Sequence, residues 1–285
     1  LFFHLFSNLY NDYFDVTSGT DEANTEYFNA GMNSSMLKGA QLSGGSRAVE
    51  LGLITLKGTK SLANIMFVLG LLTASGILYT SYLNTGSTTN AYHAAIIALI
   101  GVLIGYFYTA KPIRLSSRYG LGEISIFLAF GPLLTLGTGF AIAAETIIPY
   151  SNEFYNLLIL GMPIGLLTTN ILFINQYPDY TSDKKVGKNH LVVLIGKKAS
   201  RWIYALNFAI AVGSLYFISE NIVNDTQGLL FMYLLIPITM IYSFYLISGL
   251  FKYYNSRELI KYNIHTIYFH MFFSFVYMII LANFQ

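Results

Sequence analysis

The chain has 285 residues, of which 54% are hydrophobic and only 11% are charged, with a formal net charge of +2. A soluble domain carries about 25% charged residues, so this composition excludes an ordinary soluble protein and indicates an integral membrane protein. The absence of cysteine excludes a disulfide framework and thiolate chemistry. We therefore expect the lipid bilayer as a partner, and no nucleic acid.

Long apolar segments follow one another along the chain, and each predicts a spanning helix, because a span needs about 20 mainly apolar residues. None of them has the alternating pattern of a barrel strand. The expected spans are 1–14 (in part), 61–83, 91–110, 121–144, 155–177, 201–219, 228–250 and 263–283. The sequence thus predicts one all-α domain over residues 1–285, a polytopic transmembrane helical bundle with eight visible helices.

Positive charge marks one side of this predicted bundle. All 16 Lys and Arg residues lie in alternate connections or at their helix ends, namely 15–60, 111–120, 178–200 and 251–262. The other connections hold acids but no Lys or Arg. The positive-inside rule predicts that the first set is cytoplasmic, in a cell inner or plasma membrane. Residue 1 is Leu and apolar residues follow at once, so we expect the chain to lack its N-terminal part.

A polar stripe ends the first apolar segment. Asn8, Asn11, Asp12 and Asp15 are spaced so that they share one face of a helix. Carboxylate and amide oxygens suit Mg²⁺, which usually binds one or two carboxylates plus substrate phosphates. Asp21 adds an acid in the turn-rich stretch that follows. Taken alone, this run is equally well interpreted as a solvated helix end.

A second polar run repeats the four-residue spacing with Asn175, Asp179 and Asp183. Pro178 is expected to interrupt the helix here and to free backbone carbonyls. The basic residues that follow are Lys184, Lys185 and Lys188. A surface ion-pair network is the alternative. However, two acid clusters on one side repel each other unless cations bridge them, and a diphosphate with Mg²⁺ provides such a bridge, with lysines holding the remaining phosphate charge.

The connection 111–120 lies on the same predicted side as both acidic runs. Lys111 and Arg114 stand at its start, and arginine binds phosphate oxygens bidentately. On charge alone they are interpreted as positive-inside anchors. Glu123 enters the next span directly after Gly-Leu-Gly. The five histidines show no metal-ligand spacing, and His190 is interpreted as structural.

These residues together resemble the UbiA-type membrane prenyltransferases. The run Asn11-Asp12-Tyr-Phe-Asp15, then Gly19-Thr-Asp21, resembles the first Asp-rich motif of that family. The run Asp179-Tyr-Thr-Ser-Asp183-Lys-Lys-Val-Gly187-Lys188 resembles the second. Three further segments look like the MenA branch, which prenylates 1,4-dihydroxy-2-naphthoate: Lys111-Pro-Ile-Arg114, Gly120-Leu-Gly-Glu123 and Gly44-Gly-Ser-Arg47.

The resemblance implies nine helices around a central cavity, so that eight visible helices fit a missing first helix. It implies a polyprenyl diphosphate and an aromatic acceptor as substrates, Mg²⁺ as cofactor, a long cytoplasmic loop over 16–60, and active-site loops over 111–120 and 178–200. The implied catalytic residues are Asp15, Asp179, Asp183 and Lys111. The implied Mg²⁺ ligands are Asn11, Asp12, Asp15, Asp179 and Asp183. The implied diphosphate-binding residues are Asn8, Asn11, Asp12, Asp21, Arg47, Arg114, Asn175, Lys184 and Lys188.

Other functions stay open at this point. Within the family, the acceptor is alternatively 4-hydroxybenzoate, a tetrapyrrole or a glycerol phosphate ether lipid, and the segment between Asp21 and Gly44 is longer than the naphthoate branch leads us to expect. A cation-coupled transporter also uses buried acids and broken helices. Here, however, the acids lie at the cytoplasmic helix ends. A phosphatidyltransferase also uses spaced acids with Mg²⁺, but its tight acidic run is not found.

Overall fold

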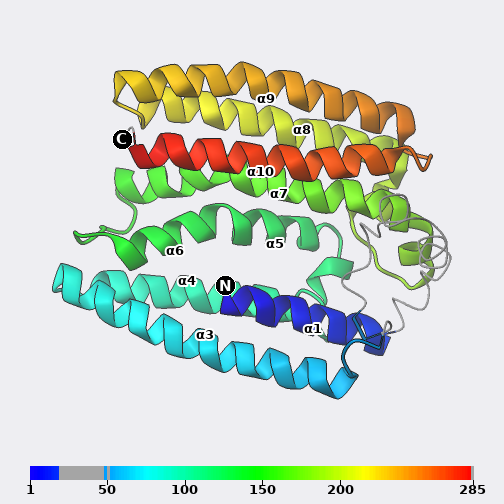
Figure 1. The fold of residues 1–285 in the computed structure, drawn as a ribbon, viewed down its shortest axis with the longest axis horizontal. Coiled ribbons are helices and arrows are strands. Elements are labelled where there is room, and N and C mark those ends of the chain that lie inside the picture. The colour runs from blue at the N-terminus through cyan, green and yellow to red at the C-terminus, as the bar shows by residue number, and fades with distance from the viewer. Residues whose placement is uncertain (19–47, 50–51, 284–285) are drawn as a thin grey trace. The chain divides into compact units, whose positions relative to one another are not determined.

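The structure is a computed structural model that describes residues 1–18, 48–49 and 52–283. Its regular elements are helices, so the predicted all-α class is confirmed (Figure 1). In chain order they are α1 (Phe2–Ser18), α3 (Leu56–Thr85), α4 (Thr88–Phe107), the 3-10 turn η2 (Leu115–Ser117), α5 (Leu121–Phe130), α6 (Pro132–Ile142), α7 (Asn152–Lys185), α8 (Leu191–Asn221), α9 (Thr226–Tyr253) and α10 (Leu259–Asn283).

Seven helical segments in the described part are long and apolar enough to cross a membrane. They correspond to the seven complete spans that the sequence predicts, with α5 and α6 counted together as residues 121–142. The eighth expected span, residues 1–14, coincides with α1 from Phe2 onward; α1 has 17 residues and is not among the seven.

Two predicted loops are shorter in the structure. The expected loop 16–60 ends earlier, because α3 begins at Leu56. Residues 178–200 are not a loop, because α7 continues through Pro178 to Lys185 and α8 begins at Leu191. A proline removes one backbone hydrogen bond and strains the preceding turn, but the helix resumes when the residues on either side keep helical geometry. The acidic run around Asp179 and Asp183 therefore lies on a helix, and the true connection covers only residues 186–190.

The described chain divides into two compact units. The first unit comprises residues 1–125, 137–147 and 178–194, and the second comprises 126–136, 148–177 and 195–285. Each is described here by itself.

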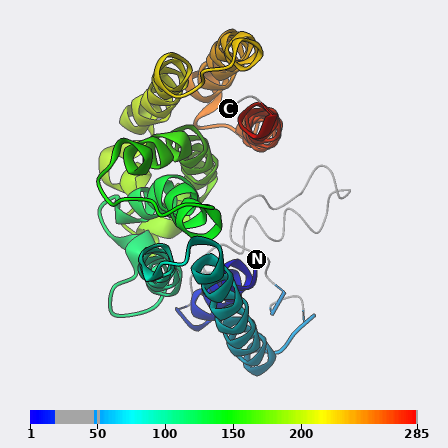
Figure 2. The same cartoon turned by 90° about the vertical axis from the view of Figure 1, so that its left-hand side faces the viewer.

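In the first unit, α1 packs against α3 and α4 (Figure 1). Aromatic side chains form the core between them. Phe6 and Tyr10 are buried against Ala63, and Tyr106 packs against them. Close approach needs small residues: a Cβ at Gly70 would come within 2.7 Å of the Phe3 ring. The view along the helices in Figure 2 shows α1 beside α3. The apolar half of α1 is thus fixed, and this fixes where its polar end lies.

In the second unit, α10 is tied to α7 and α8 by buried hydroxyl groups. Tyr204 and Thr266 share a hydrogen bond of 2.8 Å, and the Tyr277 hydroxyl donates to the carbonyl of Leu160 at 3.0 Å. Figure 2 shows α10 end-on at the C-terminus. Glycines set a second close contact, since a Cβ on Gly161 would lie 2.5 Å from the carbonyl of Gly131.

We expect Gly161→Ala to lower the stability of the protein. Its new methyl group would meet backbone, which cannot rotate away, and overpacking costs about 1–3 kcal/mol. Thermal unfolding in detergent micelles measures the loss. Gly213→Ala is the matched control, because nothing lies within 4 Å of its Cβ position and alanine favours a helix by about 1 kcal/mol. Equal melting temperatures for the two variants would contradict the close contact.

Candidate functional site

The polar end of α1 is held by the end of α4. The Thr109 hydroxyl donates to Asn11 Oδ1 at 2.8 Å. Asp15 follows one turn later and is partly buried. Asn8 is exposed, and its amide lies 3.3 Å from His4 Nε2. The predicted stripe is helical as expected, but Asn8 has a local partner within α1 rather than one at the end of α4.

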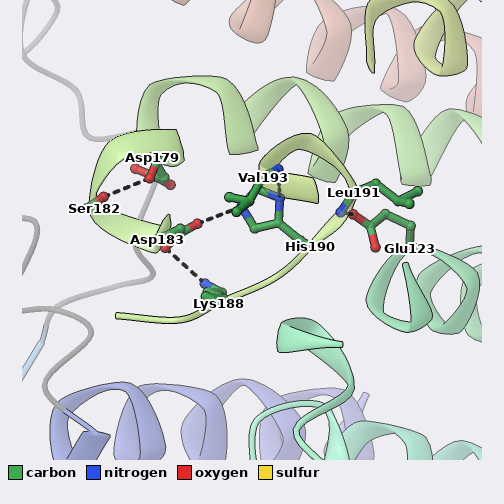
Figure 3. A network of polar contacts seen from close by, with 8 residues as sticks. All are labelled: Glu123, Asp179, Ser182, Asp183, Lys188, His190, Leu191 and Val193. Atoms are coloured by element: carbon green, nitrogen blue, oxygen red, sulfur yellow. Dashed lines mark hydrogen bonds and ion pairs between the residues drawn. The ribbon is translucent and has the colours of Figure 1, made fainter. Parts of the chain in front are cut away.

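The end of α7 brings a lysine back onto an aspartate. Gly187 is in the left-handed region with φ 74°, a conformation that glycine adopts without strain. The Lys188 N–H donates to the carbonyl of Asp183 at 2.9 Å, and the Gly187 N–H donates to that of Lys184 at 3.4 Å. This pair of bonds is a Schellman motif, which reverses the chain at a helix C-terminus. As a result Lys188 Nζ lies 3.7 Å from Asp183 Oδ1 (Figure 3).

His190 lies at the start of α8 and contacts the same aspartate. It is 1% exposed, and its Nε2 lies 3.0 Å from Asp183 Oδ2. The Val193 N–H donates to His190 Nδ1 at 3.4 Å, so the side chain also caps the helix (Figure 3). Our sequence interpretation of His190 as structural missed the contact with Asp183. Its place directly before a helix, seven residues after Asp183, is the signal that would have suggested it.

The connection 111–120 pairs with the connection between α7 and α8. The Tyr119 N–H donates to the carbonyl of Asn189 at 2.9 Å, and the Asn189 N–H donates to that of Ser117 at 3.2 Å. Gly120 has φ 86°, and a Cβ there would lie 2.9 Å from the Leu191 side chain. These two connections are therefore joined by backbone hydrogen bonds and close packing.

Glu123 adds a side-chain link at the same place. It is 4% exposed, and its Oε1 accepts a hydrogen bond of 2.9 Å from the Leu191 N–H, the first amide of α8 (Figure 3). The first amides of a helix have no partner within the helix, and the positive end of the helix dipole favours a carboxylate there. Glu123 thus holds the start of α8 against α5.

We expect Glu123→Ala to destabilise the protein by about 1–3 kcal/mol, because the partly buried Leu191 amide loses its acceptor. Glu123→Gln keeps a carbonyl acceptor and should recover most of that loss. Hydrogen exchange at the first turn of α8, measured by mass spectrometry, reports the change directly. Equal protection in the Ala variant and the native chain would refute this role for Glu123.

Charged groups from both acidic runs gather in the first unit. Asp15 is partly exposed, yet burial is the main reason that the pKa of its carboxyl is raised, with Lys188 and Arg114 lowering it and Asp183 and Asp12 raising it. Burial is the largest single effect on the pKa of Lys188 and lowers it. Asp183, Asp15 and Asp179 together raise this pKa by more, so the net pKa lies above its ordinary value. We call these six residues the charge cluster: Asp12, Asp15, Arg114, Asp179, Asp183 and Lys188.

A phenol borders the charge cluster. Tyr108 directly follows α4, and the pKa of its hydroxyl is raised by burial and then by the nearby carboxylates of Glu123, Asp15 and Asp183. It therefore stays a neutral hydrogen-bond donor beside these acids. The sequence prediction did not include Tyr108, which precedes Lys111 by three residues.

Other predicted site residues are not drawn into this cluster. Lys111 is exposed, and exposed Lys184 lies over the Tyr180 ring at 5.7 Å. Asn175 belongs to the second unit, where the Asn263 amide donates to its Oδ1 at 3.0 Å. Asp21 and Arg47 lie outside the described residues.

The donor set can be tested against Mg²⁺, the metal that the motifs imply. Among the residues that the structure describes, no three His, Cys, Asp or Glu side chains are grouped closely enough to hold a metal ion by themselves. The carboxylates of Asp15, Asp179 and Asp183 are nevertheless hard oxygen ligands. An ion that shares its coordination with substrate phosphates needs only one or two of them, so the residues fit Mg²⁺ that binds together with a diphosphate.

The fold and the site together define a class of protein: an all-helical membrane protein in which carboxylates and cations gather at the helix ends. Residues 1–276 match the UbiA prenyltransferase family, and the chain belongs to that family. The resemblance inferred from the two acidic motifs is thus confirmed at the level of the family.

Curated relatives include two bacterial 1,4-dihydroxy-2-naphthoate octaprenyltransferases. That of Escherichia coli is 28% identical over 70% of this chain and 56% of its own length, and that of Bacillus subtilis is 26% identical over 74% and 57%. A 2-carboxy-1,4-naphthoquinone phytyltransferase from Synechocystis is 34% identical over 44% of this chain and 37% of its own. The chain therefore spans about half the length, or less, of these relatives.

A solved structure of a UbiA homolog from Archaeoglobus fulgidus bound to GPP and Mg²⁺ has a similar fold. The TM-score is 0.52 at 18% sequence identity, and the match covers 98% of this chain and 88% of the other. At this identity the likeness supports the fold and carries no residue roles.

Proposed function

We propose that the protein transfers a polyprenyl group from a polyprenyl diphosphate to 1,4-dihydroxy-2-naphthoate within the membrane. The charge cluster is the observation that carries this proposal. It combines carboxylates from two distant motifs with Lys188 and Arg114, and a diphosphate with Mg²⁺ complements both kinds of charge. Asp15, Asp179 and Asp183 bind the diphosphate through Mg²⁺, while Lys188 and Arg114 contact its oxygens directly.

In the proposed reaction, the bond between C1 of the prenyl chain and the diphosphate oxygen breaks, and the electron pair stays on the diphosphate. The ammonium of Lys188 and the guanidinium of Arg114 stabilise the negative charge that develops there. Mg²⁺, when bound with the diphosphate, supplies Lewis-acid stabilisation of the same charge. An electron-rich carbon of the acceptor then bonds to C1 and releases its proton. The reaction requires that water be excluded from the site, because water would capture the allylic cation.

The choice of acceptor follows the relatives. Two of them are named for 1,4-dihydroxy-2-naphthoate and a third for a naphthoquinone, which supports a naphthoate acceptor and a place in menaquinone biosynthesis. The segments Lys111-Pro-Ile-Arg114 and Gly120-Leu-Gly-Glu123 point to the same branch. The positive charges on one set of connections support a cytoplasmic active site in a cell inner or plasma membrane.

The test is an acceptor screen with membranes that contain the full-length protein and labelled geranylgeranyl diphosphate. We expect Mg²⁺-dependent product with 1,4-dihydroxy-2-naphthoate and none with 4-hydroxybenzoate. Product with 4-hydroxybenzoate, a tetrapyrrole or glycerol phosphate instead would keep the prenyl transfer and refute the acceptor. Cation-driven flux in proteoliposomes without any transfer product would refute the enzyme and favour a transporter.

A further inference from the structure

The Asp183 carboxylate is held on both sides by other side chains in the first unit. It is 5% exposed, its Oδ2 lies 3.0 Å from His190 Nε2, and its Oδ1 lies 3.7 Å from Lys188 Nζ. The distance of 3.0 Å is that of a hydrogen bond, whereas 3.7 Å is an ion pair without one. The two oxygens thus differ in their contacts with described residues: Oδ2 lies at hydrogen-bond distance from His190, and Oδ1 forms a longer ion pair with Lys188 (Figure 3).

The backbone determines which nitrogen of His190 carries the hydrogen. His190 is the residue before α8, and the Leu194 N–H donates to its carbonyl at 3.0 Å. The Val193 N–H donates to His190 Nδ1 at 3.4 Å. A ring nitrogen that accepts a hydrogen bond has no hydrogen of its own, so the hydrogen is on Nε2. His190 therefore donates to Asp183 with one nitrogen and caps α8 with the other.

Asp183 needs such a donor because of its place in α7. It lies in the last turn of the helix, where the negative end of the helix dipole disfavours a carboxylate. Hydrogen bonds from outer residues also fix the orientation of carboxylates that bind metals, and their loss costs about 10–100-fold in metal affinity or activity.

We propose that His190 is a positioning residue for Asp183. Through Nε2–H it fixes Oδ2, so that Oδ1 is presented to Mg²⁺ and the diphosphate, and through Nδ1 it sets where α8 begins. This inference rests on the proposed function, since it assumes that Asp183 binds Mg²⁺ with a diphosphate. The short segment from Asp183 to His190 then contains both partners of the carboxylate. Lys188, which follows the end of α7, is the cation, and His190, which caps the start of α8, is the hydrogen-bond donor.

Two substitutions separate the two roles. In His190→Asn the side-chain carbonyl takes the place of Nδ1, so the cap for Val193 is kept, but the side chain is too short to reach Asp183. In His190→Gln the amide nitrogen takes the place of Nε2 and can donate to Asp183, but glutamine is a weaker N-cap than asparagine. His93→Asn is the control, because His93 is a partly buried histidine of the same unit whose Nδ1 bonds within its own helix to Thr89 at 2.8 Å.

The measurement is equilibrium binding of labelled geranylgeranyl diphosphate to the full-length protein in lipid nanodiscs, titrated with Mg²⁺, alongside melting without ligand. We expect His190→Asn to raise the Mg²⁺ concentration for half-maximal binding by about 10–100-fold. Its melting temperature should also fall, because the buried Asp183 carboxylate loses a hydrogen-bond donor. His190→Gln should recover most of the Mg²⁺ response despite lower melting. His93→Asn should keep the native Mg²⁺ midpoint.

The opposite order would overturn the inference. If His190 acts only as a helix cap, the Gln variant is impaired and the Asn variant binds Mg²⁺ and the diphosphate as the native chain does. Equal impairment of both variants would assign His190 to packing alone and would refute the positioning role. If the native protein itself shows no Mg²⁺-dependent binding, the proposed function fails first, and that outcome is distinguished by the native titration.

Discussion

Asp15→Asn is expected to abolish most prenyl transfer while making the ligand-free protein more stable. The carboxylate is proposed to bind the diphosphate through Mg²⁺, and loss of one such electrostatic contact lowers the rate by about 10²–10³-fold. Without ligand, burial raises the pKa of Asp15 above its ordinary value of 3.8, so the ionised form is disfavoured in the folded state. Asparagine removes that unfavourable charge.

The sign of the pH dependence follows from that shift. The stability contributed by protonated Asp15 is fully present below pH 3.8 and is lost as pH rises through the raised pKa of the folded protein. The Asn variant loses nothing over this range. Its advantage in melting temperature should therefore be largest near neutral pH and should shrink on acidification.

A prenyl-transfer assay measures the loss of activity, and thermal unfolding across pH measures the change in stability. Glu145→Gln is the control, since it neutralises an exposed acid outside the helices and should change neither activity nor melting. Native turnover by the Asn variant would disprove the role of Asp15 in catalysis, whatever its stability.

Lys188→Gln is expected to weaken diphosphate binding by about 10–100-fold, because a hydrogen bond to a charged group contributes about 1.5–3 kcal/mol. It should also destabilise the ligand-free protein, because Asp183, Asp15 and Asp179 lose the cation that lies among them. The pKa of Lys188 is raised above its ordinary 10.5, so its charge and the stability that it contributes are retained up to that pH and lost only above it.

Lys185→Gln is the matched control for Lys188, because Lys185 is exposed at the end of α7, three residues before Lys188. Binding of inorganic diphosphate and geranylgeranyl diphosphate with Mg²⁺, compared between the two variants, separates a specific contact from a general loss of positive charge. Equal losses in both would argue that Lys188 acts only as one of several surface cations.

Regular spacing made part of this site predictable from the sequence. The four-residue intervals from Asn11 to Asp15 and from Asp179 to Asp183 predict shared helix faces, and both runs are helical in the structure. Both acidic runs lie on the predicted side that carries the Lys and Arg residues, which suggested that they form one site. Asp15 and Asp183 do influence each other in the first unit.

Other features depend on contacts that spacing does not encode. Pro178 suggested a helix break, yet neighbouring residues keep α7 helical to Lys185. The partners of His190 and Glu123 lie on other elements or across a connection, so only the folded chain reveals their hydrogen bonds. Lys111 was predicted as a site residue from its charge, but its side chain is exposed and does not belong to the charge cluster.

The backbone pairing of Ser117 and Tyr119 with Asn189 has a practical consequence for exchanging segments between relatives. In a chimera that replaces only the connection with Arg114, the new backbone has to re-form its pairing with Asn189, and a residue other than glycine at position 120 would collide with the Leu191 side chain. The two connections have to be transplanted together, as one cassette drawn from a single donor. Sequence swaps that respect this pairing would separate effects on acceptor preference from damage to the proposed diphosphate-binding residues.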